Sequence, residues 1–567
     1  MQQRATPTFV ELFTPKLVTV LREGYGLQEL RSDIIAGLTV SIIALALSMA
    51  IAIASGVSPE RGLYSAIVGG FVISALGGSR FQIGGPEGAF IVLVLATVTV
   101  HGIDGLVLAT FLSGIILVAM GLLQLGTFIK YIPFPVTVGF TAGVAVIIFA
   151  SQMRELLGIT LAHEPGELVP KVKALWAVRD SFNAQAVLVS AGTIGVILLV
   201  RRFRPHWPGM LVAVAVAAAV TGLVGMQVAT IGTNFGGIPS GLPMPELPVF
   251  TLEKVMAVLP SAFSFALLGG IESLLSAVVA DSMSGRRHRS NCELVAQGLG
   301  NMAAALFGGF CVTGTLARTA TNVRAGARGP VAGMLHAVFL LLFMLLAAPL
   351  AAYIPLAALA GVLALVAWNM FELRAFSALI RASRGDAVVV LSTFLLVIFR
   401  DLTEGILVGF GLGVLLFLHR MAQAVEVQTG MPMVMQDQAD HVPGQDRVPY
   451  DPAQSSDRDI LVHRISGAFF FGSAANVAIA LDRLAERPKA FVLDFSAVPL
   501  LDSTAASTIE SFVRKARRRQ ARVHIAGAIP QVRHVLLGQG VRPPDVAYNA
   551  SVADALEAAR AAIAAPA

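Results

Sequence analysis

The sequence has little charge and almost no cysteine. Only 13% of its 567 residues are Asp, Glu, Lys or Arg, and its two cysteines are Cys292 and Cys311. Neither cysteine stands in a metal-binding spacing, so neither a zinc site nor a disulfide framework is expected. No nucleotide-binding loop is expected, because the glycine-rich stretches lie inside apolar runs. No arrangement of nucleophile and base is recognised either. The sequence therefore predicts neither an enzyme nor a bound cofactor.

Hydrophobic residues dominate instead. They make up 56% of the chain, and the mean hydropathy is +0.76. Repeated apolar runs, long enough to cross a bilayer as helices, predict a polytopic α-helical membrane protein. The formal net charge is +6. Membrane proteins carry such an excess as Lys and Arg on the cytoplasmic face, so nucleic-acid binding is not predicted. No cleavable signal peptide is expected.

Fourteen apolar segments are expected to form a membrane domain over residues 34–426. A cytosolic segment, 1–33, precedes them and is expected to hold a short amphipathic helix near 9–21. The segments divide into two repeats of seven, about 34–226 and 258–420. Those of the first repeat are 34–55, 61–77, 86–100, 104–123, 134–150, 184–200 and 208–226. Those of the second are 258–280, 294–309, 313–327, 330–349, 354–370, 386–399 and 403–420.

The third and tenth segments are short, and each is introduced by small or turn-forming residues. Gly84-Gly85-Pro86 precedes the third, and Thr313-Gly314 opens the tenth. Interrupted segments at matching positions of two halves indicate an inverted-repeat transporter with its binding site between them. If Thr313-Gly314 starts a helix, and Pro86 occupies a first helical position, free N–H groups and positive dipole ends form an anion site. The residues predicted to bind substrate are Gly85, Pro86, Glu87, Gly88, Ala89, Thr313, Gly314, Thr315, Leu316, Ala317 and Arg318.

The distribution of basic residues predicts the orientation. With the N-terminus inside, most Lys and Arg residues of the connections fall on one side of the membrane, for example Arg80, Arg286 and Arg420. This pattern follows the positive-inside rule. It places both termini in the cytosol of a protein of the cell (inner) membrane.

The composition changes after Arg420. Residues 427–457 are polar, with Pro, Gln and Asp, and are interpreted as a linker. From 458 to 567, short β-branched strands alternate with amphipathic helices. This pattern predicts a small cytosolic α/β domain with a helix-flanked sheet.

Several motifs together resemble the SulP (sulfate permease) family of anion transporters. They are Gly85-Pro86, the run FALLGGIES from Phe265 to Ser273, and TGTLART from Thr313 to Thr319. The last domain resembles a STAS domain, through Leu493-Asp-Phe and Leu501-Asp-Ser-Thr504. Within the family, NCELVAQGLGN followed by ARTATNVRAGA looks most similar to bacterial members that move C4-dicarboxylates.

The resemblance implies a specific architecture. It comprises two inverted seven-helix repeats, with the substrate held in a core domain between the third and tenth half-helices, a gate domain, elevator-type motion and a homodimer. In stand-alone STAS proteins the serine that matches Ser503 is phosphorylated. Ser503 is therefore a candidate regulatory residue, and the STAS domain a candidate site for a cytosolic partner.

Arg318 has two interpretations. It either sets the potential of an anion site or pairs with a carboxylate or backbone carbonyl groups to hold the two repeats together. The small residues near Gly85 can likewise serve either close approach of a ligand or ordinary helix packing.

Two carboxylates are expected inside the membrane. Members of the family usually carry a small or hydroxylic residue at the position of Glu87. Its carboxylate either caps a helix or couples the anion to a proton. Glu272 is the stronger candidate for binding a coupling ion, H⁺ or Na⁺, together with Ser273. The alternative is a structural pair with Arg318, and Ser273, Ser276 and Asp281 could share either arrangement.

Ser503 lies at a predicted strand-to-helix turn. Its hydroxyl could cap the helix instead of being phosphorylated. The basic run 514–519 is interpreted as a solvated helix face, with contact to anionic lipid as the alternative.

The sequence favours a secondary active transporter of a small anion, either sulfate, bicarbonate or a C4-dicarboxylate, coupled to H⁺ or Na⁺. An uncoupled exchanger or channel-like facilitator is the first alternative. A nucleobase transporter on the same fold is the second, and Arg318 would be unexpected there. A membrane scaffold that acts through its STAS domain is the third.

Overall fold

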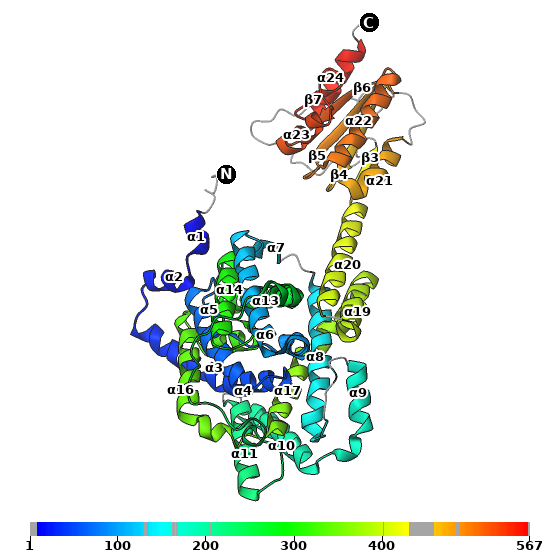
Figure 1. Ribbon diagram of the computed structural model, residues 1–567. Coiled ribbons are helices and arrows are strands. Elements are labelled where there is room, and N and C mark those ends of the chain that lie inside the picture. Colours follow the sequence, from blue (N-terminus) through cyan, green and yellow to red (C-terminus); the bar gives the residue numbers. More distant parts are fainter. Residues whose placement is uncertain are drawn as a thin grey trace. The chain divides into compact units, whose positions relative to one another are not determined.

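The computed structural model describes residues 8–129, 133–161, 165, 168–204, 207–400, 402–429, 459–482 and 488–564. The chain forms two compact units, Met1–Gly413 and Val414–Ala567. The first holds nearly all the apolar helices, and the second holds the sheet (Figure 1).

The helices of the first half follow the predicted segments. They are α3 (Leu27–Ala54), α4 (Pro59–Tyr64), the π-helical turn η1 (Ser65–Gly69), α5 (Gly70–Leu76), the 3-10 turn η2 (Gly88–Phe90), α6 (Ile91–Leu122), α7 (Gly126–Ile129), α8 (Phe134–Leu157), α9 (Leu168–Ala177), η3 (Arg179–Ser181), α10 (Ala184–Phe203), α11 (Gly209–Val224) and α12 (Ile231–Phe235). The third and fourth segments run together in α6, whose helical backbone is interrupted at Gly102, with φ of 68° and ψ of −173°.

The second half also follows the predicted segments. Its helices are α13 (Leu252–Ser284), α14 (Ser290–Leu306), α15 (Leu316–Arg324), α16 (Val331–Ala351), α17 (Leu356–Met370), α18 (Leu373–Ala382), α19 (Arg384–Phe399) and α20 (Leu402–Gln423). In the described part of the chain, eight helices are long and apolar enough to cross a membrane. The prediction of a helical membrane-spanning fold is confirmed.

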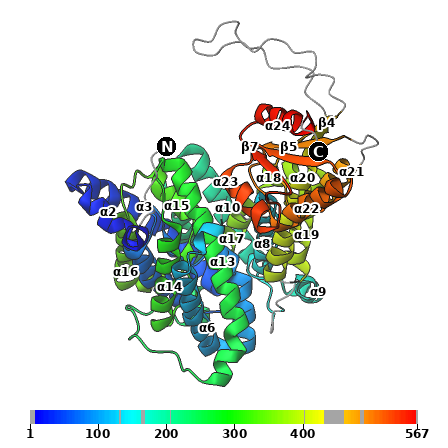
Figure 2. The same cartoon turned by 90° about the horizontal axis from the view of Figure 1, so that it is seen from above.

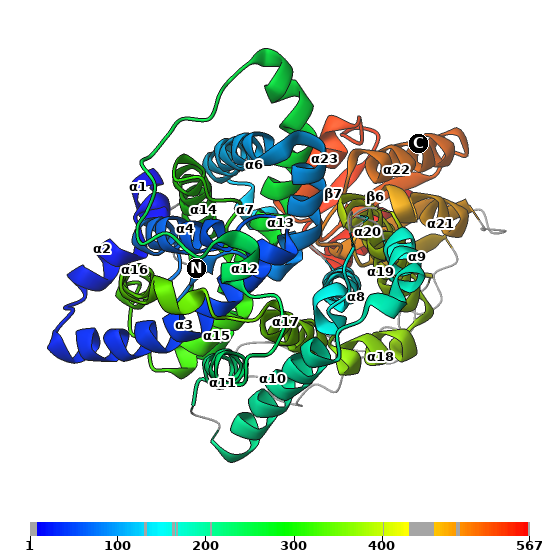
Figure 3. The same cartoon turned by 60° about the horizontal axis from the view of Figure 1, so that its bottom comes forward.

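The membrane unit contains two groups of helices. The first group comprises α3, α5, α6, α13, α14, α15 and α16, with α6 packed on α13 and α14, and α16 alongside α3 (Figure 2). The second group comprises α8, α10, α17, α18 and α19, and it gathers on the other side (Figure 3). Helix α17 also contacts α3, so it joins the two groups.

Small residues allow the closest contact within the first group. A Cβ atom on Gly114 of α6 would lie 2.5 Å from the carbonyl oxygen of Gly298 of α14, and a Cβ on Gly298 would lie 2.4 Å from that of Gly114. Since neither distance leaves room for a methyl group, the two backbones touch. Membrane helices associate in this way, because hydrocarbon lipid gives no hydrophobic gain from their contact.

The C-terminal unit is a five-stranded sheet with helices on both faces. Its strands are β3 (Glu426–Thr429), β4 (Ile460–Ser466), β5 (Ala490–Ala497), β6 (Arg522–Ala526) and β7 (Ala547–Asn549), in that order. The pair β3–β4 is antiparallel and the other pairs are parallel. The helices are α21 (Phe471–Asp482), α22 (Ser503–Arg518), α23 (Pro530–Gly538) and α24 (Val552–Ala564).

Strand β5 shows why helices cover both faces. Phe491 and Leu493 lie in the larger hydrophobic cluster, whereas Ala490 and Val492 lie in a second cluster with Leu556 of α24. Successive side chains of a strand point to opposite faces, so β5 is buried on both sides, as a central parallel strand must be. The predicted helix-flanked sheet is confirmed.

Three boundaries differ from the prediction. Residues 426–429, assigned mostly to the linker, form β3 and pair with β4, while 430–457 lie outside the described residues. The single helix expected near 9–21 is two helices, α1 (Phe9–Phe13) and α2 (Lys16–Arg22). Pro15 explains the break, because the residue before a proline avoids helical geometry. The amphipathic helix α18 was not predicted.

Candidate functional site

The two interrupted segments meet in a short antiparallel ladder. Strand β1 (Gly84–Gly85) pairs with β2 (Thr313–Gly314), so that Gly84 lies opposite Gly314 and Gly85 opposite Thr313. The chain is extended here, because pairing satisfies backbone groups that would be unpaired at a bare helix end. The predicted helix start at Thr313-Gly314 is therefore wrong, as α15 begins at Leu316 after the N-cap Thr315.

The first half-site also begins later than predicted. Turn η2 starts at Gly88, with Glu87 at its N-cap position, so Pro86 does not occupy the first helical position. Gly85, Pro86, Gly88 and Ala89 are all buried. The two half-sites are therefore joined through strands, and their helical turns diverge from that joint.

The threonines of the second half-site serve mainly to hold this joint. The hydroxyl of Thr313 donates to the carbonyl of Gly269, at 2.9 Å. The backbone N–H and the hydroxyl of Thr315 both donate to the carbonyl of Ile83, at 2.9 and 3.2 Å. Thr319 returns the contact, because its Oγ1 accepts from the N–H of Ile83 at 3.1 Å. These bonds hold the two half-sites in position. The positive charge of the site comes from Arg318.

Arg318 is buried, with 2% of its surface exposed. Its Nη2 donates to the carbonyl of Pro86 at 3.1 Å and lies 3.4 Å from the hydroxyl of Ser48. Its Nε and Nη1 have no hydrogen-bond partner in the described part of the chain. Arg318 thus fits both of its interpretations, since it ties the two half-sites together and keeps two of its nitrogens without a hydrogen-bond partner.

Gly85 lies directly against this guanidinium. A Cβ atom there would lie 2.3 Å from Nη1 of Arg318. Any larger residue would therefore displace the unpaired N–H groups. Here the absence of a side chain allows the close approach of a charged group.

Glu87 lies near this cation and Glu272 lies near Glu87, and neither carboxylate forms a described ion pair with Arg318. Glu87 is partly exposed, and its side chain does not cap η2, so the capping interpretation is wrong. It interacts electrostatically with both Arg318 and Glu272. Glu272 of α13 is 8% exposed. Among the described ion pairs, none joins either carboxylate to Arg318, because no such contact falls within 4.0 Å.

Of the three polar residues near Glu272 in the sequence, Ser273 and Ser276 lie close to it on α13, and Asp281 lies further along the helix. Ser273 is buried, and its carbonyl accepts from the side chain of Gln82 at 3.1 Å. The hydroxyl of Ser276 is buried without a partner in the described structure. Asp281 does not share this arrangement, because it pairs with His288 at 2.7 Å near the end of α13.

The site is open along one side. The first turn of α15 is exposed, with Leu316 at 41% and Ala317 also accessible. On the opposite side, Thr313 and Gly314 are buried. Among the predicted site residues, the exposed ones therefore lie at the start of α15.

Three polar residues that support the site were not predicted. Asn301 of α14 is 1% exposed, and its side chain bonds to both the N–H and the carbonyl of Val312, at 2.9 and 2.8 Å. Gln82 bonds to Ser273, and Ser65 accepts from the N–H of Phe310 at 2.8 Å. The signal available in the sequence was a polar side chain inside an apolar run, as with Arg318.

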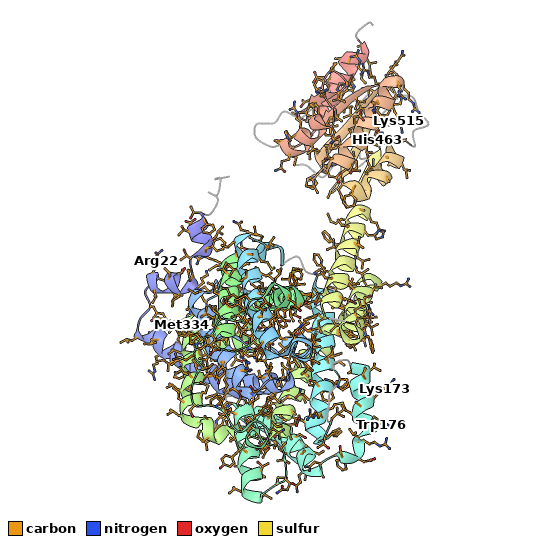
Figure 4. All side chains as sticks on the ribbon, in the orientation of Figure 1. Arg22, Lys173, Trp176, Met334, His463 and Lys515 are labelled. Carbon is orange, nitrogen blue, oxygen red and sulfur yellow. The ribbon has the colours of Figure 1, made fainter. Side chains whose placement is uncertain are left out.

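In the C-terminal unit, Asp502 rather than Ser503 caps α22. Its two carboxylate oxygens accept from the N–H groups of Ala505 and Phe471, at 2.8 and 2.9 Å. The prediction of a hydroxyl cap is therefore wrong, and Ser503 is an exposed first helical residue. His463 of β4 belongs to the same unit (Figure 4). Burial lowers the pKa of its imidazole to about 4.

The basic run at the end of α22 makes ion pairs within its own unit. Arg514 pairs with Glu510 at 2.9 Å, and Arg517 pairs with Asp545 at 2.5 Å. Both arginines are exposed. This arrangement fits a solvated helix face.

Comparison with known proteins gives consistent matches. The model described as "Sulfate permease family" matches residues 30–393, and the "STAS domain" model matches residues 452–541. YvdB of Bacillus subtilis (strain 168), whose name describes a candidate sulfate transporter, is 37% identical over 523 residues, 92% of this chain and 95% of that protein. The bicarbonate transporter BicA of Picosynechococcus is 29% identical over 523 residues, 90% of each chain.

A solved structure extends the comparison to the fold. Murine Slc26a9, an anion transporter in the inward-facing state, matches with a TM-score of 0.82 and 18% identity, over 99% of this chain and 96% of that one. At this identity the match shows the fold alone. It covers both the helical membrane unit and the C-terminal sheet.

Proposed function

Because the chain belongs to the sulfate permease family, we propose that it is a secondary active transporter of a compact oxyanion. Its membership makes it an anion transporter of the sulfate/bicarbonate type. The relatives described above are named as sulfate or bicarbonate transporters. The substrate, sulfate or bicarbonate, would bind between η2 and the start of α15. Coupling to H⁺ or Na⁺ and elevator-type motion complete the proposal.

The observation that carries the proposed site is the state of Arg318. A buried guanidinium with two unpaired nitrogens is costly, since unpaired buried donors lose their hydration without replacement. An oxyanion offers the charge and the acceptor oxygens that these groups lack, and its bonds to a guanidinium are among the strong ones. Gly85 allows the approach because its position carries no Cβ.

The proposed coupling rests on the two carboxylates. An anion arriving at Arg318 would be repelled by Glu87 and Glu272 unless their charge were neutralised. A proton on either carboxylate, or a Na⁺ beside Glu272 and Ser273, would remove that repulsion. Anion and cation would therefore bind together more readily than either alone. This linkage is what concentrative transport requires.

The proposed elevator motion rests on the two helix groups. Both half-sites lie within the first group, through α13, α14 and α15. The second group contacts η2 through α8. We propose that the first group carries the site and moves against the second.

Several further expectations belong to the same proposal. They are a location in the cell membrane with both termini in the cytosol, a homodimer, a cytosolic partner for the STAS domain and a regulatory role for Ser503. Bilayer lipid is the surrounding solvent of the membrane unit. Transport of a C4-dicarboxylate stays a competing substrate prediction. The relatives named above favour sulfate or bicarbonate.

Uptake into proteoliposomes tests this function. The purified full chain would be given labelled sulfate, bicarbonate or succinate, with an inward gradient of H⁺ or of Na⁺ imposed separately. Accumulation of sulfate or bicarbonate above equilibrium under one gradient is expected. Equilibration without accumulation under both gradients would contradict coupling and favour the uncoupled exchanger. No uptake of any anion would contradict the transport function.

A further inference from the structure

Two apolar side chains lie opposite the turn that carries the first half-site. A Cβ atom placed on Gly88 would lie 3.1 Å from Cδ1 of Ile148 and 3.8 Å from Sδ of Met370. Ile148 belongs to α8 and Met370 ends α17. Both belong to the second helix group, whereas η2 leads into α6 of the first. They form an apolar wall that contacts the turn of the first half-site from the other group.

The wall is firmly held. Ile148 is fully buried, at 0% exposure, and lies in the same hydrophobic cluster as Ala89 and Phe90 of η2. Met370 packs against that cluster. Helices α8 and α17 pack against each other. The two wall residues therefore lie on helices that hold each other in place.

Neither wall residue can bind an anion. Isoleucine has no polar atom, and the methionine thioether is only a weak acceptor. The wall therefore limits the space of the site and does not add affinity for the anion. The distance at Gly88 leaves no room for an added methyl group without movement of Ile148.

We infer that Ile148 and Met370 set the size of the anion that the site accepts. This inference rests on the proposed function and deepens it. In sulfate and bicarbonate the charge surrounds one atom, so Arg318 can bind it without the rest of the molecule meeting the wall. In a C4-dicarboxylate a second carboxylate lies several bonds away from the first. With one end at Arg318, the other would be pressed against apolar side chains, where an ionised group loses its hydration. The wall selects compact oxyanions by excluding longer ones.

Shortening the wall is expected to change the selectivity. The test compares initial rates of sulfate and succinate uptake into proteoliposomes for the wild type, Ile148→Ala, Met370→Ala and the double variant. The ratio of succinate to sulfate uptake should rise by at least about tenfold in the double variant, since removing methylene-sized groups from a pocket changes discrimination by that order. Ile148→Val, which removes a single methyl group, should give an intermediate ratio with little risk to folding.

A matched control comes from the same helix. Phe149 is 48% exposed, so Phe149→Ala shortens a neighbouring side chain on the outer face of α8. Its ratio should equal that of the wild type. Wild-type sulfate uptake together with an unchanged ratio in all wall variants would overturn the inference alone. A wild type that transports succinate as fast as sulfate would also overturn it. A wild type that takes up no anion would overturn the proposed function, and this inference with it.

Discussion

The two half-sites have matching geometry but different chemistry. The second repeat supplies a buried cation, Arg318, and threonines whose hydroxyls bond to neighbouring backbone. The first repeat supplies Gly85 and Gly88, which allow close approach, and the carboxylate of Glu87. The fold thus brings together two similar turns, one that provides positive charge and one that provides space. Fold alone does not determine what such a site binds, so the proposed anion site rests on these residues and not on the shared fold.

Removing the cation Arg318 from the second half-site is expected to have the largest effect on anion uptake. Arg318→Ala is expected to lower the uptake of sulfate or bicarbonate by about 10- to 100-fold, because a charge-assisted hydrogen bond is worth roughly 1.5–3 kcal/mol. Arg318→Lys should not restore the rate, since an ammonium group lacks the planar fork that reaches both Pro86 and an anion. Initial uptake rates at equal amounts of reconstituted protein measure this. A folded Arg318→Ala protein with wild-type uptake would refute the assignment of the anion site.

The two carboxylates are expected to differ in their effect on coupling. Glu272→Gln should abolish accumulation above equilibrium while leaving exchange of anion across the membrane, because it removes the buried charge beside Ser273. Glu87→Gln should weaken accumulation only in response to a pH gradient. The measurement is steady-state accumulation with H⁺ and Na⁺ gradients applied separately. If Glu87→Gln concentrates the anion in a pH gradient as well as the wild type does, its part in proton coupling is wrong.

Asn301 tests how far the second half-site depends on its support. Asn301→Ala would leave the N–H and carbonyl of Val312 without their side-chain partner. Unpaired buried groups cost roughly 1–3 kcal/mol each, so a loss of about 2–6 kcal/mol of stability is expected for the two groups. Thermal unfolding of the purified protein, followed with and without sulfate, measures the effect. Asn322→Ala, which removes a hydrogen bond to the carbonyl of Phe81, should cost less.

The smallest effects are expected in the C-terminal unit. Asp502→Ala should destabilise that unit by about 1 kcal/mol, because it removes the cap of α22 and the bond to Phe471. Ser503→Ala should change stability by less than about 0.5 kcal/mol, since Ser503 is exposed. Thermal unfolding of the full chain compares the two variants. A larger loss for Ser503→Ala would contradict the assignment of Asp502 as the cap.

Much of this molecule could be predicted because a membrane imposes strong rules on sequence. Long apolar runs predicted the membrane helices, and the interval between the expected segments 86–100 and 104–123 contains the interruption at Gly102 of α6. Thr313-Gly314 and Gly84-Gly85 marked the two half-sites, because small residues rarely interrupt a span without reason. The alternating pattern after 458 identified the C-terminal sheet.

The errors arose where tertiary contacts override local pattern. A helix start was expected at Thr313, but the opposing Gly84–Gly85 segment offered a strand partner that local sequence does not reveal. Strand β3 was placed in the linker because it pairs with β4 across many intervening residues. Asn301 and the wall residue Ile148 escaped notice for a similar reason. Their roles depend on Val312 and Gly88, which only the fold brings near.

The most direct test of the central claim is whether a compact oxyanion occupies the space at the start of α15. Ala317 is exposed there, and Ala378 of α18 is exposed outside the site and serves as a control. Ala317→Cys and Ala378→Cys would each be alkylated in the purified full chain, with and without sulfate or bicarbonate. The account predicts that one of these anions slows the alkylation of Ala317→Cys and leaves Ala378→Cys unchanged. Alkylation of Ala317→Cys at the same rate with saturating amounts of either anion would contradict it.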